Sequence, residues 1–178
     1  MTQRPINVLF LCTHNSARSI LAEATLNHIG KGRFRAFSAG SSPRANQQPN
    51  PLGLQVLREA GIRTDGLRSK SWDEFADAEA LNTGMETEME TEMEMDLIIT
   101  VCDNAAGEVC PVWPGHPATA HWSYADPSEG AGDDAHKLRA FRLTLTEMRR
   151  RLDLLISLPP EKLARSSVEG SARNLSNS

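Results

Sequence analysis

The stretch from residue 6 to residue 19 reads INVLFLCTHNSARS and decides the fold class of the chain. Its first six residues are almost all apolar and rich in strand formers, which is typical of a strand buried on both faces of a parallel sheet. The polar residues after Cys12 lead into a helical pattern over 19–29, and Gly30 follows it as a stop signal. We therefore expect a strand, a tight loop and a helix in immediate succession.

The rest of the chain continues this alternation of strands and helices. Strand patterns occur at 33–39, 97–101 and 119–122, and helical patterns occur at 51–60, 72–81 and 133–158. Strands that alternate with helices through short connections indicate an α/β fold with a parallel sheet. We predict one domain over residues 1–158. Residues 159–178 are rich in serine and poor in apolar side chains, so we predict a disordered tail.

Length and composition restrict the class of protein. The 178 residues, 39% hydrophobic and 24% charged, suffice for one domain with a core. The longest apolar run is too short to span a bilayer, and the N-terminus lacks a secretion signal, so we expect a cytoplasmic protein without a membrane partner. A net charge of −4 argues against a strongly basic nucleic-acid binder. Three cysteines in a chain of this kind favour catalysis, metal binding or redox cycling over structural disulfides.

The charges are distributed unevenly along the chain. Residues 71–136 contain sixteen acidic side chains and no lysine or arginine, so all nineteen basic residues lie in the two flanks. Cys12 belongs to a basic flank, whereas Cys102 and Cys110 belong to the acidic segment. We therefore expect these two thiols to stay mostly protonated until they meet an activated sulfur.

Residues 85–95 read METEMETEMEM and repeat with a period of four. In a helix, Met85, Met89 and Met93 would form one stripe, which could bind a metal or a partner. A duplicated low-complexity insertion at the surface explains the same repeat without a function, and we adopt that interpretation.

Cys12 and Arg18, separated by five residues, stand between the first strand and its helix. A loop this short turns successive backbone N–H groups toward its centre, and the helix adds the positive end of its dipole. Arg18 can bind two oxygens of a tetrahedral oxyanion. The alternative is a buried cysteine, a helix cap at Ser19 and a surface arginine. We predict an oxyanion-binding loop made of Thr13, His14, Asn15, Ser16, Ala17, Arg18 and Ser19.

The same donors are expected to lower the pKa of the Cys12 thiol. Ser19 can donate a hydrogen bond to the sulfur, and Asn15 can hold the loop by bonding its backbone. We place His14 at the rim of the loop rather than in the role of general base.

Asp126-Pro127 follows the last predicted strand. A reaction with a cysteine nucleophile needs an acid to protonate the leaving oxygen, and an aspartate in this loop could reach the oxyanion site. Asp-Pro is also a common turn pair. Beside the predicted oxyanion loop, we favour the catalytic interpretation.

Cys102 and Cys110 are the other two cysteines. Parallel strands deliver functional residues at their carboxyl ends, so Cys102 is expected at the same sheet edge as Cys12. The Gly- and Pro-containing segment around Cys110 suits a pair of thiols that forms a disulfide reversibly. A zinc site with His116 and His121 is the alternative, but its spacing matches none of the usual tight cysteine pairs, so we expect no metal.

Together these motifs resemble the arsenate reductases built on the low-molecular-weight protein tyrosine phosphatase fold. The resemblance covers about residues 5–157. It rests on four motifs, which are VLFLCTHNSARS at 8–19, FSAGS at 37–41, VCDNAAGEVCP at 101–111, and His121-Trp122 with Asp126-Pro127. It implies a three-layer fold with a four-stranded parallel sheet, and the reduction of arsenate to arsenite in arsenic detoxification.

The resemblance also implies a role for each site residue. Cys12 attacks arsenate held by the loop and Arg18, and Asp126 protonates the departing oxygen. Cys102 then attacks the Cys12 sulfur and arsenite leaves, after which Cys110 takes over the disulfide. No tightly bound cofactor is implied, and an external thiol reductant, either thioredoxin or glutaredoxin with glutathione, closes the cycle.

Two other functions stay open at this point. A phosphatase would need only Cys12, Arg18 and Asp126. The chain has Ser128 after Asp126-Pro127, where tyrosine phosphatases usually place an aromatic residue, and this favours arsenate over phosphotyrosine. The chain also differs from many members of the family that it resembles, because they have a cysteine where this chain has Ala17. A zinc- or arsenite-sensing module built on Cys102 and Cys110 is the non-enzymatic alternative.

Overall fold

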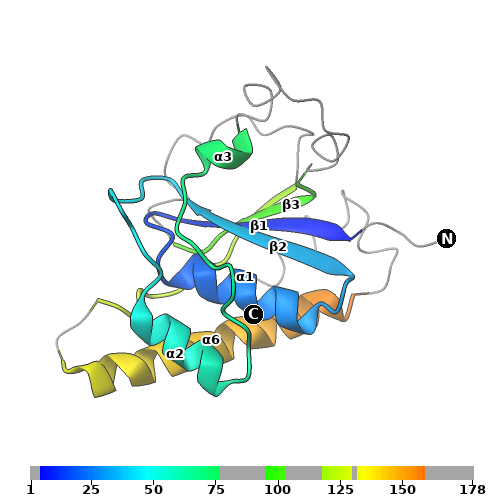
Figure 1. The fold of residues 1–178 in the computed structure, drawn as a ribbon. Helices are drawn as coiled ribbons and strands as arrows, with labels where there is room; N and C mark the ends of the chain where they lie inside the picture. Colours follow the sequence, from blue (N-terminus) through cyan, green and yellow to red (C-terminus); the bar gives the residue numbers. More distant parts are fainter. Residues whose placement is uncertain (1–4, 77–94, 103–117, 130–131, 159–178) are drawn as a thin grey trace.

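The computed structural model describes residues 5–76, 95–102, 118–129 and 132–158 (Figure 1). Its elements are β1 (Ile6–Cys12), α1 (Arg18–Ile29), β2 (Phe34–Gly40), α2 (Pro51–Glu59), α3 (Asp73–Ala76), β3 (Leu97–Thr100), β4 (Ala118–His121) and α6 (Asp134–Ile156). The predicted segments agree with these bounds to within a residue or two, except that the predicted helix at 72–81 is described only as far as Ala76.

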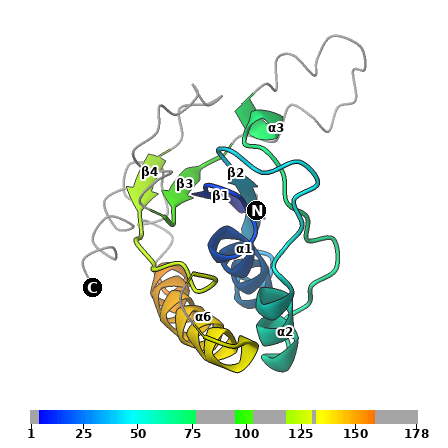
Figure 2. The same cartoon turned by 90° about the vertical axis from the view of Figure 1, so that its left-hand side faces the viewer.

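The four strands form one sheet in the order β2-β1-β3-β4, and every neighbouring pair is parallel. Helices α1, α2 and α6 lie on one face and α3 lies on the other, which gives three layers (Figures 1 and 2). The predicted four-stranded, three-layer α/β fold is confirmed.

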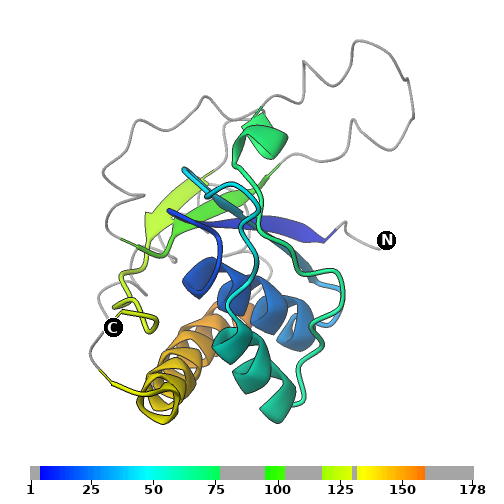
Figure 3. The same ribbon diagram turned by 60° about the vertical axis from the view of Figure 1, so that its left-hand side comes forward.

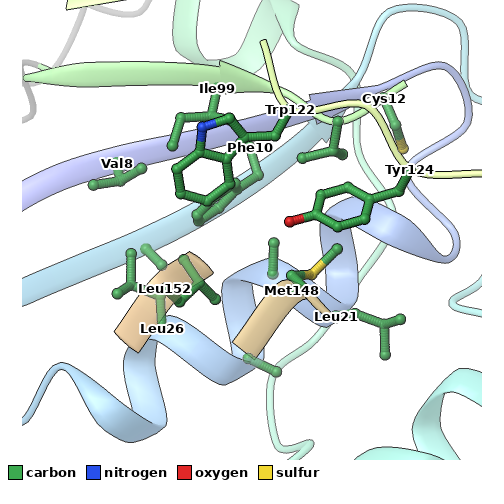
Figure 4. Close-up of a cluster of buried hydrophobic side chains, with 14 of the residues drawn as sticks. Val8, Phe10, Cys12, Leu21, Leu26, Ile99, Trp122, Tyr124, Met148 and Leu152 are labelled. Carbon is green, nitrogen blue, oxygen red and sulfur yellow. The ribbon is translucent and has the colours of Figure 1, made fainter. Parts of the chain in front are cut away.

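The side chains of β1 are almost all apolar because both faces of this strand are covered. Val8 and Phe10 pack into a large core beneath the sheet, where Figure 4 shows them above Leu26, Met148 and other helical side chains. Leu9 and Leu11 point to the other face and pack into a smaller core. The buried members of that smaller core are Leu9, Leu11, Ala39, Trp72, Met95 and Ile98.

The ends of the strands bring the predicted site together. Cys12 is the last residue of β1, and the next strand in the sheet, β3, ends two residues before Cys102. Figure 3 shows the loop between β1 and α1 at the same end of the sheet as the segment between β4 and α6. Gly40, at the end of β2, permits this arrangement because a Cβ atom there would lie 2.6 Å from the Thr13 carbonyl oxygen.

Several predictions concern residues outside those that the structure describes. These are the segment 77–94, which contains most of the repeat at 85–95, together with Cys110, His116 and the tail at 159–178. The domain boundary at residue 158 and the nature of the repeat therefore stay predictions. Among the described residues, no helix is both long and apolar enough to cross a membrane.

We expect Met148→Ala to destabilise the protein because Met148 is fully buried between α6 and the sheet (Figure 4). Loss of a buried side chain of this size costs about 2–5 kcal/mol of the free energy of unfolding. Leu143→Ala is the matched control, since Leu143 is 61% exposed on the same helix and its loss should cost below about 0.5 kcal/mol. Urea denaturation measures both values, and equal losses would contradict the packing described here.

Candidate active site

Cys12 lies at the start of a loop that leads directly into α1. Its side chain is only 3% exposed. α1 has no side-chain hydrogen bond at its N-cap and no acidic residue in its first turn. The first backbone N–H groups of a helix have no partner within the helix, so an anion bound in the loop can use them. Ser19 lies inside α1 rather than at its cap, which removes the alternative interpretation of that residue.

A chain of hydrogen bonds fixes a donor on the Cys12 sulfur. The backbone N–H of Lys70 donates to Asn15 Oδ1 over 2.9 Å, so the amide nitrogen of Asn15 must face the Ser19 hydroxyl, 2.7 Å away. Because Ser19 Oγ accepts that bond, its own proton can be donated to Cys12 Sγ at 2.9 Å. The backbone N–H of Asn15 also donates to the sulfur, over 3.2 Å. Donors from Ser19 and Asn15 therefore converge on Cys12.

The position of Asn15 differs from the prediction. Its side chain bonds Lys70 and Ser19, not the backbone of its own loop, and its backbone has a φ of 55°. Asparagine enters this left-handed region more readily than most residues. Asn15 and Ser19 are both fully buried beneath the loop, and neither lines the cavity that Cys12 and Arg18 line.

The predicted lowering of the Cys12 pKa is wrong in its net direction. Burial raises the pKa of this thiol, because water cannot solvate a buried thiolate, and the neighbouring Cys102 adds to this effect. The hydrogen bonds from Ser19 and Asn15 lower the pKa but do not offset the burial. Formation of the thiolate therefore depends on the donors around the sulfur.

Arg18 joins the oxyanion loop to the segment after β4. Its Nη1 donates to the Tyr124 carbonyl oxygen over 2.9 Å, and its Nη2 lies 3.4 Å from Asp126 Oδ2. The other oxygen of Asp126 accepts hydrogen bonds from the backbone N–H and the hydroxyl of Ser128, at 2.9 and 2.6 Å. Asp126 thus takes part in a turn and also lines the cavity beside Arg18, so the turn is confirmed and its catalytic role stays a prediction.

One cavity of about 590 Å³ contains the predicted oxyanion site. Cys12, Arg18 and Asp126 all line it, and so do the loop residues Thr13, His14, Ser16 and Ala17. His14 places Nδ1 3.1 Å from the Ser42 carbonyl oxygen, which agrees with a residue at the rim.

A second wall of this cavity was not predicted from the sequence. It is formed by Arg44, Ala45, Asn46, Gln47, Gln48, Pro49, Asn50 and Pro51, and Ser128 and Glu129 complete the lining. Asn50 connects the wall to the loop because its backbone N–H donates to the Ser16 carbonyl oxygen over 2.8 Å. The Asn-Pro pair, a helix start signal, was the one local indication of this wall.

Cys102 lies beside the loop at the same sheet edge as Cys12, as predicted. It is 1% exposed, its thiol is not in a disulfide, and its sulfur lies 3.5 Å from Thr13 Oγ1. The described residues contain no group of three metal-binding side chains, and His121 Nδ1 lies 2.7 Å from Thr100 Oγ1. Cys110 and His116, the other residues of the zinc alternative, lie outside the described residues.

Known proteins resemble this chain in both sequence and structure. The arsenate reductase of Bacillus licheniformis is 31% identical over 146 residues, which cover 82% of this chain and 91% of the relative. The structure of the arsenate reductase from Archaeoglobus fulgidus has 26% sequence identity and a TM-score of 0.57, and the match covers 85% of this chain and 99% of that one. The structure of a thioredoxin-dependent arsenate reductase of Corynebacterium glutamicum has 25% sequence identity and a TM-score of 0.53. That match covers 86% of this chain and 65% of the other chain.

The sequence profile of one protein family covers nearly the whole described fold. The family is the low molecular weight phosphotyrosine protein phosphatases, and the match runs over residues 7–168. The relatives found by sequence and by structure support an enzyme of the arsenate reductase kind. The chain belongs to the low molecular weight phosphotyrosine protein phosphatase family.

Proposed function

We propose that this protein reduces arsenate to arsenite through a relay of three thiols. The observation that carries the proposal is the placement of a second reduced cysteine, Cys102, beside the oxyanion loop, where its sulfur lies 3.5 Å from Thr13 Oγ1. Hydrolysis of a phosphate ester needs no second thiol, whereas reduction of arsenate does. The named arsenate reductases among the relatives support the same function.

In the first step, the sulfur of Cys12 attacks the arsenic atom. A sulfur–arsenic bond forms and an arsenic–oxygen bond breaks. Asp126, which must enter this step in its protonated form, gives its proton to the departing oxygen, so that it leaves as water. The backbone N–H groups of the loop and the guanidinium of Arg18 bind the remaining oxygens. Arg18 contacts Asp126 Oδ2 at 3.4 Å, so the oxyanion and the acid share one cation.

In the second step, the sulfur of Cys102 attacks the sulfur of Cys12. The electron pair of the sulfur–arsenic bond passes to arsenic, arsenite leaves, and a disulfide joins the two cysteines. Cys110 would next attack Cys102, which restores the Cys12 thiol and moves the disulfide to the second pair.

An external thiol carrier would then reduce the disulfide. One similar protein is thioredoxin-dependent, which supports thioredoxin, and glutaredoxin with glutathione is the alternative. A relay that starts from reduced thiols suits a reducing compartment, so we also propose a cytoplasmic location. No tightly bound cofactor is needed for any of these steps.

Phosphatase activity is the second candidate function. The name of the family and the arrangement of Cys12, Arg18 and Asp126 around one cavity favour it. Among the described residues that line the cavity, none is phenylalanine, tyrosine or tryptophan, the residues that would stack best on a phenyl ring.

Cys102→Ser should abolish steady-state production of arsenite and leave hydrolysis of a simple phosphomonoester intact. Arsenite production is measured by oxidation of NADPH with thioredoxin and its reductase, and separately with glutaredoxin, glutathione and glutathione reductase. Cys110→Ser should block turnover in the same way but still allow a single turnover. If both variants keep producing arsenite at the wild-type rate, the relay is wrong.

Asp126→Asn should lower kcat without raising KM for the oxyanion. Loss of a general acid costs about 10²- to 10⁴-fold in rate. The neutral amide would release Arg18 from its ion pair, so oxyanion binding should not weaken. Ser128→Ala is the control, since it removes one hydrogen bond to Asp126 but keeps the acid, and it should change kcat far less. A wild-type kcat in Asp126→Asn would rule out this acid.

Ser19→Ala should raise the pH at which Cys12 becomes reactive. The variant removes one of the donors that lower the pKa of the thiol. A hydrogen bond to a charged group contributes about 1.5–3 kcal/mol, which corresponds to about one to two pKa units. The rate of Cys12 alkylation by iodoacetamide against pH gives the midpoint. Ser42→Ala, at an exposed position, is the control and should leave the midpoint unchanged.

A further inference from the structure

An ion pair that the proposed mechanism does not use lies buried behind the oxyanion loop. Lys70 Nζ is 3.7 Å from Glu23 Oε1, and the two side chains are only 8% and 11% exposed. The same carboxylate oxygen accepts a hydrogen bond from the hydroxyl of Ser38, on β2, over 3.3 Å. Burial raises the pKa of the Glu23 carboxyl and lowers that of the Lys70 ammonium, so both groups resist being charged there. Such a pair rarely offsets its own desolvation, so stability alone is a weak explanation for it.

The backbone of Lys70 is what connects this pair to the loop. Its N–H donates to Asn15 Oδ1, and the hydroxyl of the preceding Ser69 donates to the Asn15 carbonyl oxygen over 2.6 Å. The Lys70 carbonyl oxygen accepts a hydrogen bond from the N–H of Gly40 over 2.8 Å. Two consecutive residues therefore hold Asn15 by its side chain and by its backbone, in a conformation with positive φ.

Glu23 connects the pair to the same helix that contacts the nucleophile. It follows Ser19 by four residues on α1, so the two side chains lie on one face of the helix. Ser19 contacts Cys12, and Glu23 contacts Lys70. Contacts therefore run from Cys12 through Asn15 and Lys70 to Glu23, and α1 carries both Glu23 and the Ser19 that contacts Cys12.

We propose that Glu23 and Lys70 are positioning residues that hold Asn15 in place and so direct the Ser19 proton at the Cys12 sulfur. The ammonium anchors the 69–70 segment over α1, and that segment fixes which way the Asn15 amide faces. Without the anchor, the amide can turn, Ser19 no longer has to accept from it, and the sulfur loses a donor. The proposal rests on the proposed function only in taking Cys12 as the nucleophile.

Two other charged side chains lie near the Glu23–Lys70 pair. Arg68 acts on both Glu23 and Lys70, and Glu74 acts on Lys70. Arg68 and Glu74 also form an exposed ion pair with each other at 2.7 Å. Lys70 Nζ also donates to the Arg68 carbonyl oxygen over 3.1 Å. Substitutions at positions 23 and 70 leave the Arg68 and Glu74 pair intact, so its charges are constant across the test.

The test measures Cys12 alkylation by iodoacetamide against pH in Glu23→Gln and Lys70→Met, with mass spectrometry to separate Cys12 from the other cysteines. We expect the midpoint to rise and alkylation at pH 7 to slow by about tenfold, which corresponds to one pKa unit. Lys70→Arg keeps the cation and should restore most of the rate. Glu59→Gln is the matched control, because it breaks the exposed pair with Arg142 at 3.0 Å and should change nothing at Cys12.

A double variant tests the route through Asn15. In an Asn15→Ala background, Lys70→Met should slow alkylation no further, because the side chain that it positions is gone. Additive effects would overturn the route. A wild-type alkylation profile in Glu23→Gln and Lys70→Met, with lower thermal stability, would overturn the proposal by making the pair merely structural.

Chemical rescue covers the case in which Lys70→Met does not fold. Glu23 also lines a separate cavity of about 450 Å³, and we expect methylammonium to reach its carboxylate from there. In Lys70→Ala, methylammonium should speed Cys12 alkylation, whereas tetramethylammonium, which cannot donate a hydrogen bond, should not. No rescue by methylammonium would count against the proposal. None of these assays uses arsenate, so a failure of arsenate reduction in the wild-type protein would be seen separately.

Discussion

A sulfur atom that is 3% exposed can carry negative charge only if the protein supplies the donors that water would supply, and the active end of this molecule depends on that constraint. Ser19 and the Asn15 backbone donate to the Cys12 sulfur. The donor and acceptor roles in these hydrogen bonds follow from the backbone N–H of Lys70. Because this group can only donate, it decides which end of the Asn15 amide faces Ser19. The donors on the Cys12 sulfur are therefore arranged by several segments, not by the loop alone.

The order of the strands brings the residues of both proposed steps to one end of the sheet. β1 lies between β2 and β3 in the centre of the sheet, so its last residue, Cys12, has Gly40 on one side and the end of β3 on the other. On the β2 side, the backbone comes close to the loop and supports it, which requires a glycine. On the β3 side, the chain delivers Cys102. A parallel sheet that places the nucleophile strand at its centre can therefore offer an oxyanion site and a second thiol at one edge.

Arg18 connects these features to Asp126, the proposed acid. Its two ends contact the Tyr124 backbone and the Asp126 carboxylate, so the segment after β4 is held over the cavity by the same cation that would bind the oxyanion. The guanidinium of Arg18 offsets the negative charge of Asp126. A carboxylate can therefore lie near the proposed oxyanion site. The uneven distribution of charge along the sequence agrees with this arrangement, since Arg18 comes from a basic flank and Asp126 from the acidic segment.

The sequence by itself determined the elements and the ends at which they meet. The apolar run before Cys12, the spacing to Arg18 and the strand before Cys102 are local patterns, and local patterns fix a strand, a loop and a helix. The direction of the Cys12 pKa, the wall that begins at Arg44 and the support of Asn15 by Lys70 were decided only by the tertiary structure. Lys70 reaches Asn15 from 55 positions away, and the desolvation of Cys12 comes from everything packed around it. Burial and contacts between distant segments depend on the whole fold, so no local sequence pattern predicts them.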